Sequence, residues 1–295
     1  MTRSRLTRIA VSLILLAGVL APVAGAQSGG RESAPEVSSE IEWLDGRLRL
    51  DIRLPLTEEQ RNRPAAADAA ARSVRDDVPR FLQQEAAALL VDSRYTLGEY
   101  YERSPDLALR VSRLSEELEP VHNRLTPDLR YAELGYHLDL FPSVTSLFVE
   151  HSRVRDLPRV ISWRPTREFT GLLIYAKGEL PVHGEDRTAR VRPALFPDVY
   201  SHETAEVVME PNRVRPEVLR EQGAVAYATS VDDPVVTERV GTKPMRTLAV
   251  GVYGRYPTDP IISTADAETF FAEEANGDLI REGRIVIIVE ESVLD

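Results

Sequence analysis

Apolar and polar residues alternate in two stretches of the first half, and this two-residue period predicts strands. Residues 48–54 carry leucine or isoleucine at every second position, and residues 132–140 alternate apolar residues with Glu133, Gly135, His137 and Asp139. Such a period places all apolar side chains on one face of a strand. Asp45-Gly46 precedes the first stretch and predicts a tight hairpin turn whose two central residues have positive φ. Residues 91–95 are expected to form a further strand.

Apolar residues recur with a helical period between these strands. Residues 65–90 place one stripe on a helix, formed by Ala67, Ala70, Ala71, Val74, Val78, Phe81 and Leu82. Pro79 interrupts this segment, which predicts a kink or two shorter helices, with Asp76 or Asp77 capping the second. Ser104-Pro105 is typical of another helix start. The order of hairpin, helices and strand predicts an α+β lobe with helices packed on one sheet face.

The second half also mixes strand and helix patterns. Residues 169–176 and 284–289 are nearly continuous apolar runs, typical of buried strands, and shorter strands are expected at 224–228, 247–253 and 260–263. Helices are expected at 216–222, after Asp233-Pro234, and from Ser263 through residue 275, where Asn276-Gly277 would end the helix. The fold class is therefore α+β, with two lobes, each a mostly antiparallel or mixed sheet with helices on one face.

The N-terminal residues have the pattern of a cleaved secretory signal. Three arginines without an acid precede the apolar run 9–20, and Ala24-Gly25-Ala26 follows as an A-x-A cleavage site. The apolar run is shorter than the roughly 20 residues of a membrane-spanning helix, although an uncleaved anchor is the alternative. We expect cleavage after Ala26 and a periplasmic or otherwise exported protein. The expected organisation is a signal peptide at 1–26, a flexible polar linker at 27–40, and lobes at 41–165 and 166–295.

Charge and cysteine content narrow the expected partners. The chain carries 36 Lys+Arg against 47 Asp+Glu, a net charge of -11. Residues 166–295 contain 14 basic and 23 acidic residues, which disfavours nucleic acid and anionic lipid surfaces as partners. The chain has no cysteine, which excludes disulfides, thiol nucleophiles and a direct lipid anchor on cysteine.

No catalytic motif is apparent in the sequence. The chain lacks the Gly-x-Ser-x-Gly elbow of serine hydrolases and the glycine-rich phosphate loops, and its histidines are not paired at the i, i+4 spacing of helical zinc sites. His137 and Asp139 would share one strand face and could hold a metal or orient an imidazole, or form a solvated polar face. Asp232-Asp233 could bind a divalent cation, or Asp233 could cap the following helix.

Other polar and aromatic residues have simpler interpretations. His202 and Glu203 are adjacent and would point to opposite faces of a strand. Asp266 and Glu268 lie at a predicted helix start, where the helix dipole favours acids. Several aromatic residues could line a ligand groove or fill a core, namely Trp43, Trp163, Tyr253 and Tyr256. No residue is assigned as catalytic, cofactor-binding or metal-binding, and no cofactor is expected.

Several motifs of the second half resemble a bacterial cell-envelope family. These are FTGLLIYAKG at 169–178, RPALFP at 192–197, GAVAYA at 223–228, AVGVYG at 249–254, DPIISTADAE at 259–268 and REGRIVIIVEE at 281–291. They resemble lipoprotein-twenty-like domains, including proteins similar to the FlgP and FlgT components of flagellar outer rings. In that family an Asp is common where Tyr175 stands, and here a polar insert of residues 179–190 precedes Pro193.

The resemblance implies an exported, non-enzymatic structural or adaptor protein of the cell envelope. It would associate with flagellar or outer-membrane machinery and contact other envelope proteins or further copies of itself. The alternative is a periplasmic protein that binds a metal or small ligand, or a hydrolase, with its site near His137/Asp139 or Asp232/Asp233. The two hypotheses differ in whether polar residues converge on one site.

Overall fold

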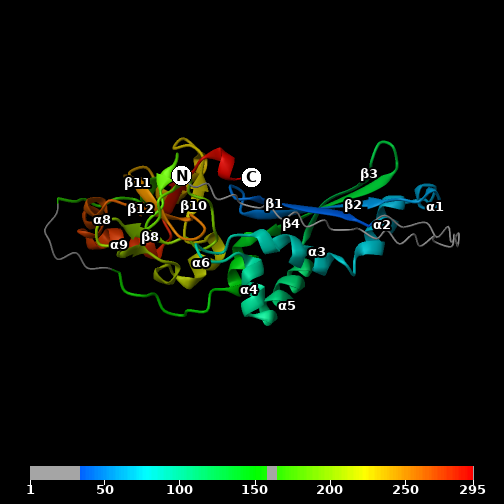
Figure 1. Ribbon diagram of the computed structural model, residues 1–295, viewed down its shortest axis with the longest axis horizontal. Helices are drawn as coiled ribbons and strands as arrows, with labels where there is room; N and C mark the ends of the chain where they lie inside the picture. Colours follow the sequence, from blue (N-terminus) through cyan, green and yellow to red (C-terminus); the bar gives the residue numbers. More distant parts are fainter. Residues whose placement is uncertain (1–33, 158–164, 295) are drawn as a thin grey trace, which may run out of the picture. The chain divides into compact units, whose positions relative to one another are not determined.

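The first half folds as a four-stranded antiparallel sheet in a computed structural model that describes residues 34–157 and 165–294. The expected signal peptide, residues 27–33 of the expected linker, and Trp163 lie outside the described residues. The strand order is β1-β2-β4-β3, with β1 at Glu36–Glu42, β2 at Arg47–Pro55, β3 at Glu119–Leu125 and β4 at Tyr131–Asp139 (Figure 1). Both alternating stretches are therefore strands, as predicted.

The predicted hairpin is confirmed, but its turn differs from the expected one. Residues 43–46 connect β1 and β2, because Glu42 pairs with Arg47. Within this turn only Gly46 has a positive φ, at 66°. The four-residue connection needs one left-handed residue, so the expectation of two positive φ angles, which included Asp45, is wrong.

Two other local expectations of the first half are wrong. Strand β1 begins at Glu36, inside the polar stretch expected as a linker, because its backbone pairs with β2 along the whole length of β1. Residues 91–95 form a turn instead of a strand. The Asp92 carboxylate accepts hydrogen bonds from the backbone N–H groups of Arg94 and Tyr95, at 2.8 and 2.9 Å, which closes this turn.

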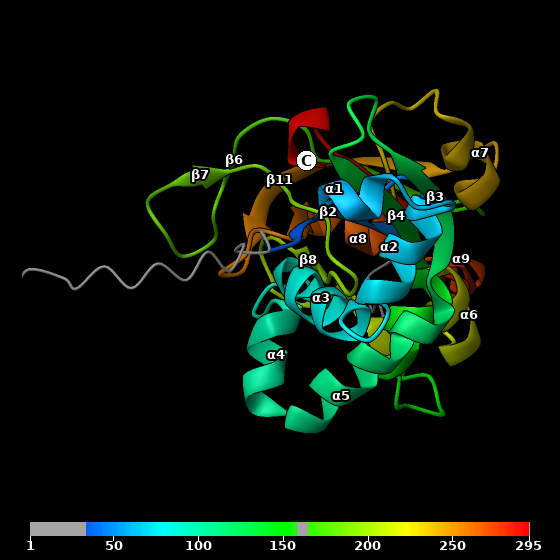
Figure 2. The ribbon, with the colours of Figure 1, turned by 90° about the vertical axis from the view of Figure 1, so that its right-hand side faces the viewer.

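The described part of the first half contains five helices: α1 (Glu58–Arg61), α2 (Ala66–Val74), α3 (Val78–Glu85), α4 (Leu97–Arg103) and α5 (Pro105–Arg113). Helices α3, α4 and α5 group together on one side of the long strands (Figures 1 and 2). Buried Phe81, Leu82 and Val111 share one core with Leu48 and Leu50 of β2. The expected break near Pro79 is confirmed as two helices, α2 and α3.

The cap expected for the second of these helices differs in detail. Asp77 occupies the position before α3, but its side chain makes no capping hydrogen bond. Instead its carboxylate faces the Arg80 guanidinium at 3.2 Å. Pro79 in the first turn of α3 has no backbone N–H group, so this helix start has one donor fewer for a capping side chain to satisfy.

The second half is built around a mixed seven-stranded sheet of order β10-β13-β5-β11-β12-β8-β9. Its strands are β5 (Leu172–Tyr175), β8 (Val199–Ser201), β9 (Val207–Met209), β10 (Ala226–Ala228), β11 (Met245–Tyr253), β12 (Asp259–Ile262) and β13 (Ile285–Ile288). The pairs β10/β13, β13/β5, β5/β11 and β12/β8 are parallel. Strands β6 (Leu180–Pro181) and β7 (Thr188–Ala189) form a separate antiparallel pair.

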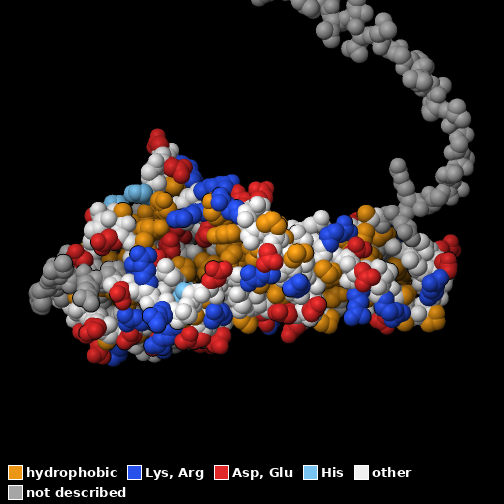
Figure 3. All heavy atoms as spheres, turned by 90° about the horizontal axis from the view of Figure 1, so that it is seen from below, with side chains coloured by type: hydrophobic (Ala, Val, Ile, Leu, Met, Phe, Trp, Pro, Cys, Tyr) orange, Lys and Arg blue, Asp and Glu red, His pale blue; other side chains and the backbone are white. Residues whose placement is uncertain are grey.

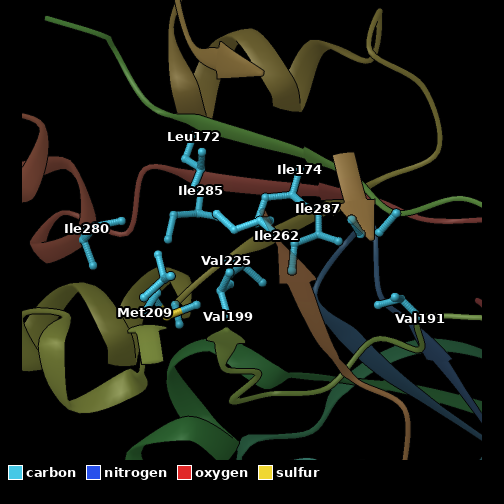
Figure 4. Packing of buried hydrophobic residues seen from close by; sticks show 14 of the residues in the cluster. Leu172, Ile174, Val191, Val199, Met209, Val225, Ile262, Ile280, Ile285 and Ile287 are labelled. Atoms are coloured by element: carbon cyan, nitrogen blue, oxygen red, sulfur yellow. The ribbon is translucent and has the colours of Figure 1, made fainter. Parts of the chain in front are cut away.

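Four helices cover this sheet: α6 (Pro216–Gln222), α7 (Pro234–Val240), α8 (Thr264–Phe271) and α9 (Glu274–Arg281). Helices α6, α8 and α9 contribute to the core that contains Leu172 and Ile174 of β5 (Figure 4). Helix α7 packs on the opposite face against Leu173 and Val286. The apolar runs predicted as buried strands are confirmed as β5 and β13, which have neighbouring strands on both sides.

The predicted helix end at Asn276-Gly277 is wrong. Both residues are buried inside α9. The Asn276 side chain accepts a hydrogen bond from the Phe169 N–H and donates to the carbonyl groups of Arg167 and Phe270. Asn276 therefore satisfies the backbone of distant segments, and this tertiary role overrides its local tendency to end helices.

Short helical turns complete the described structure. Their bounds are Ala86–Ala88, Leu114–Glu117, Leu140–Val144, Thr145–Leu147, Pro211–Arg213 and Glu291–Val293. The α+β class is confirmed, with one large sheet in each lobe, and the described chain from Ala34 onward forms one compact unit that contains both lobes. In the described residues, no helix has the length and apolar character of a membrane span.

Candidate functional site

His137 and Asp139 lie on the same face of β4, as predicted, but each has its own charged neighbour. His137 Nε2 lies 3.9 Å from a carboxylate oxygen of Glu42, and the Asp139 carboxylate accepts a hydrogen bond of 3.0 Å from Arg47 Nε. The Arg47 and Asp139 side chains are 44% and 46% exposed, so water screens this ion pair. The arrangement is that of a paired, partly solvated polar face.

The same face of the first sheet carries further ion pairs along its length. Arg49 pairs with Asp51 at 2.8 Å, and Arg124 with Glu133 at 3.0 Å. His122 lies over Gly135, where an added Cβ would come within 2.2 Å of the imidazole. This face is the one opposite the helices, because Leu48 and Leu50 point into the core. We call this row of basic and acidic side chains, which includes Arg49, Asp51, Arg124 and Glu133, the charged ladder. These four residues also line a cavity of about 400 Å³.

Asp232 and Asp233 have different surroundings. Asp233 precedes α7, but its carboxylate accepts hydrogen bonds from the backbone N–H groups of Thr229 and Ser230, both at 2.9 Å, and none from α7. Asp233 therefore does not form the expected cap of α7; its side chain stabilises the preceding loop instead. Asp232 is exposed. Among the described residues, no group of three or more His, Asp or Glu side chains is arranged to hold a metal ion.

The acids near the start of α8 serve local structure. The Asp266 carboxylate accepts a 2.6 Å hydrogen bond from the Thr247 hydroxyl, while Ser263 caps the helix by accepting from the Asp266 N–H. Glu203 and Thr264 exchange two hydrogen bonds. Hydrogen bonding from the Thr264 side chain and backbone to the Glu203 carboxylate lowers the pKa of Glu203. Glu268 also makes an interaction within the protein.

The aromatic residues of the expected set that the structure describes, Trp43, Tyr253 and Tyr256, lie at three different places. Trp43 meets Tyr227 edge to face, with ring centroids 5.9 Å apart, beside a cavity of about 310 Å³. The Tyr256 hydroxyl donates to Glu99, which also pairs with Arg255. Tyr253 lines a separate, smaller pocket together with His202.

The contacts of Trp43 with Tyr227 and of Tyr256 with Glu99 each join a residue of one lobe to a residue of the other. Backbone hydrogen bonds also connect the two lobes. The N–H groups of Leu195 and Phe196 donate to the carbonyls of Leu90 and Val91, at 3.1 and 2.8 Å. Leu195 is buried in the core of the first lobe. The turn of residues 91–95, which replaces the expected strand, therefore docks the first lobe onto the second.

Beside this contact, the structure brings together two acids that the sequence analysis did not single out. Asp259, at the start of β12, is 1% exposed, and its Oδ1 accepts hydrogen bonds from the Asp198 N–H and the Thr258 hydroxyl. Its Oδ2 is buried without a hydrogen-bond partner among the described residues. Tyr200 donates to the Asp198 carboxylate at 3.2 Å.

Burial sets the protonation of this pair. It raises the pKa of Asp198 to about 6 and, together with the negative charge of Asp198, raises the pKa of Asp259 to about 7. Each acid lies at the beginning of a strand, in PDVYS and TDPII. That position in the sequence was the available signal, but only the parallel pairing of β8 with β12 brings the Asp198 backbone to the Asp259 carboxylate.

Comparison with known protein families agrees with the two lobes. Residues 34–147 match the family model of the N-terminal domain of Treponema pallidum Tp0624, and residues 171–291 match that of its second domain. A search of curated proteins finds no match to the chain. The chain is therefore similar, in the same order along the sequence, to the N-terminal and second domains of the bacterial family represented by Treponema pallidum Tp0624.

Proposed function

We propose that this protein is an exported structural or adaptor protein of the bacterial cell envelope. The predicted signal peptide supports export, and the two matched Tp0624 domains support a bacterial origin. Without cysteine, the protein would be held in the envelope by protein contacts rather than by a lipid on cysteine. Its acidic charge favours protein partners over nucleic acid.

The observation that carries the proposal is an uncovered apolar area on the second sheet. Leu173 and Val286 are buried beneath α7. On the same face, beyond α7, Leu248 is 64% exposed, Tyr175 43% and Val250 40%. Leu248 and Tyr175 are direct neighbours in the parallel pairing of β11 with β5. A contiguous apolar area of this kind is typical of a protein interaction surface.

The other sheet offers a second broad face of a different character. The charged ladder of the first sheet carries basic and acidic groups in alternation, such as Arg53 beside Glu36 at 3.4 Å. Figure 3 shows a different side, seen from below the view of Figure 1, where α4 and α5 lie; there hydrophobic side chains lie among charged side chains of both signs. The apolar area of the second sheet and the charged ladder of the first sheet belong to one compact unit. An adaptor protein could use two such faces to hold two partners in a fixed arrangement.

The more specific form of the proposal is an association with flagellar or outer-membrane machinery. It rests on the motifs that resemble lipoprotein-twenty-like domains, and the family matches give that resemblance no support. Further copies of this chain are a second class of partner for the apolar area. The alternative, a metal-binding, ligand-binding or hydrolytic protein acting near His137/Asp139 or Asp232/Asp233, gains no specific support from the surroundings of those residues.

Site-specific photocrosslinking in the bacterium that carries the chain tests the proposal. A photoreactive amino acid at Leu248 should yield a discrete crosslinked product in the envelope fraction. The same amino acid at Leu109, a 60% exposed leucine on α5, is the matched control and should yield none. Mass spectrometry of the product distinguishes a second copy from another envelope protein. Absence of the product at Leu248, or recovery of the protein only in the cytoplasm, would refute the proposal.

A further inference from the structure

A small pocket lies at the end of the second sheet, where β8, β12 and β11 meet. Its volume is about 180 Å³, and its lining consists of His183, Tyr200, Ser201, His202, Ala205, Tyr253 and Ile261. Ile261 of β12 pairs with Tyr200 of β8, which places an apolar side chain beside the aromatic one. The pocket shares no lining residue with the apolar area around Leu248 or with the His137/Asp139 and Asp232/Asp233 sites, but it includes Tyr253 and His202, which the sequence analysis considered.

Three rings surround the opening at mutual angles. The Tyr253 ring centroid lies 5.1 Å from that of Tyr200 and 6.1 Å from that of His183, with an interplanar angle of 51° in both pairs. Rings tilted in this way do not stack on one another face to face. Tyr253 remains 38% exposed, so part of its surface is available to a ligand.

The electrostatic surroundings of the rings favour positive charge. The residues that line the pocket include no Lys or Arg. The Tyr200 hydroxyl donates to the Asp198 carboxylate, and burial together with the charges of Asp198 and Asp259 raises the pKa of Tyr200. A phenol that donates to a carboxylate has an electron-rich ring, and the negative ring face attracts cations.

The lining also restricts the kind of cation. No carboxylate forms part of the wall, so a hard metal ion would lack the oxygen ligands that it requires. A quaternary ammonium group carries its charge within a weakly hydrated envelope of alkyl groups. Aromatic faces with an apolar side chain beside them, here Ile261, complement such a group.

We propose that this pocket binds a small organic cation through an alkylammonium or quaternary ammonium group held against Tyr253, Tyr200 and His183. Cation–π attraction to the tilted rings supplies the selectivity for charge, and contact with Ile261 complements the alkyl groups. The site is independent of the adaptor role, because it lies on different residues from the crosslinking position.

Titration of the purified protein with choline tests the proposal. The neutral analogue 3,3-dimethylbutan-1-ol has the same shape without the charge and serves as the matched ligand control. At constant ionic strength, choline should saturate shifts of tyrosine and histidine ring signals in NMR spectra, with an affinity about ten-fold higher than that of the analogue. Equal binding of both compounds, or no saturable shift with choline, would overturn the proposal.

Three variants assign the site. Tyr253→Leu should abolish choline binding, whereas Tyr253→Phe, which keeps the ring, should retain it. Tyr175→Leu is the matched control, because Tyr175 is 43% exposed on the same sheet but outside the pocket. Loss of binding in Tyr175→Leu, or retained binding in a folded Tyr253→Leu, would contradict the assignment. Should Tyr253→Leu fail to fold, loss of choline binding in Tyr253→Phe would contradict it.

The source of the cation is resolved by a second arm of the experiment. Vesicles of phosphatidylcholine present the same quaternary ammonium on a membrane, and vesicles of phosphatidylglycerol are the control. Binding of choline alone supports a free solute as the ligand. Additional binding of phosphatidylcholine vesicles, lost in Tyr253→Leu, supports a lipid headgroup. Vesicle binding that persists in Tyr253→Leu would count against the pocket as the headgroup site.

Discussion

Single buried groups determine how this protein responds to pH. Near the lobe contact the Asp198 N–H donates to the Asp259 carboxylate, and nearby charges come from Asp92, Arg94 and Glu210. The pKa values of the pair, about 6 and about 7, lie above the ordinary value of 3.8. A raised carboxyl pKa means that the folded state binds protons more tightly than the unfolded state. The resulting stability is complete below about pH 4 and is lost as pH rises through 6 and 7.

Replacement of Asp259 by Asn should flatten this pH dependence. Between pH 5 and pH 8, the wild-type protein should lose about 2–3 kcal/mol of unfolding free energy relative to D259N, because D259N lacks the carboxyl group with the higher pKa and keeps only that of Asp198. Urea unfolding at both pH values measures the difference. Asp232→Asn, at an exposed acid, is the control and should follow the wild type. A D259N curve parallel to the wild-type curve would contradict the assignment.

At the scale of elements, side-chain contacts from outside a segment decide how helices begin and end. Asn276 lies inside α9 because it satisfies backbone groups of Arg167, Phe169 and Phe270. Asp233 precedes α7 but braces the preceding loop through the N–H groups of residues 229 and 230. Asn commonly ends helices and Asp commonly caps them, but in both cases the side chain instead forms hydrogen bonds with backbone groups that the local sequence pattern does not identify.

The neighbouring acids Asp232 and Asp233 allow this interpretation to be tested against the metal hypothesis. Asp233→Ala should lower the unfolding free energy by about 1–2 kcal/mol, because two backbone N–H groups lose their acceptor. Asp232→Ala should change it by less than about 0.5 kcal/mol. Thermal unfolding with and without Mg²⁺ or Ca²⁺ supplies the measurement. Stabilisation by either cation that disappears in both variants would favour a cation site instead.

At the scale of the whole molecule, the two lobes are joined by interlocking cores. Trp43 packs against both cores, and Leu195 of the second half is buried in the first. Thr145, which is fully buried, donates to the Arg220 carbonyl at 2.8 Å. Because each lobe completes the core of the other, we expect both lobes to unfold in one cooperative transition.

Trp43→Ala should therefore destabilise both lobes together. Loss of the ring from the contact with Tyr227 should cost about 2–4 kcal/mol, and hydrogen exchange should increase in β4 and in β13 alike. Leu44→Ala, at the adjacent, 49% exposed residue, should have little effect. Faster exchange confined to the strands of the first lobe would show that the lobes are energetically separate.

Much of the architecture could be predicted from the chain alone. Alternation identified β2 and β4, apolar runs identified β5 and β13, and the residues around Pro79 predicted two helices. Strand β3, with an exposed surface and no strong period, was not predicted. The polar candidates His137 and Asp139 were placed on one face correctly, but their ionic partners on neighbouring strands were not foreseeable.

The sequence by itself determined the properties that depend on local order: the α+β class, most strand and helix positions, the export pattern and the acidic charge. Only the tertiary structure decided which groups meet. The pairing of β8 with β12 joined Asp198 to Asp259, and the meeting of β8, β12 and β11 gathered Tyr200, Tyr253 and His183 around one pocket. The physical reason is that periodicity reports which face a side chain occupies, whereas contacts between distant segments depend on the packing of the complete chain.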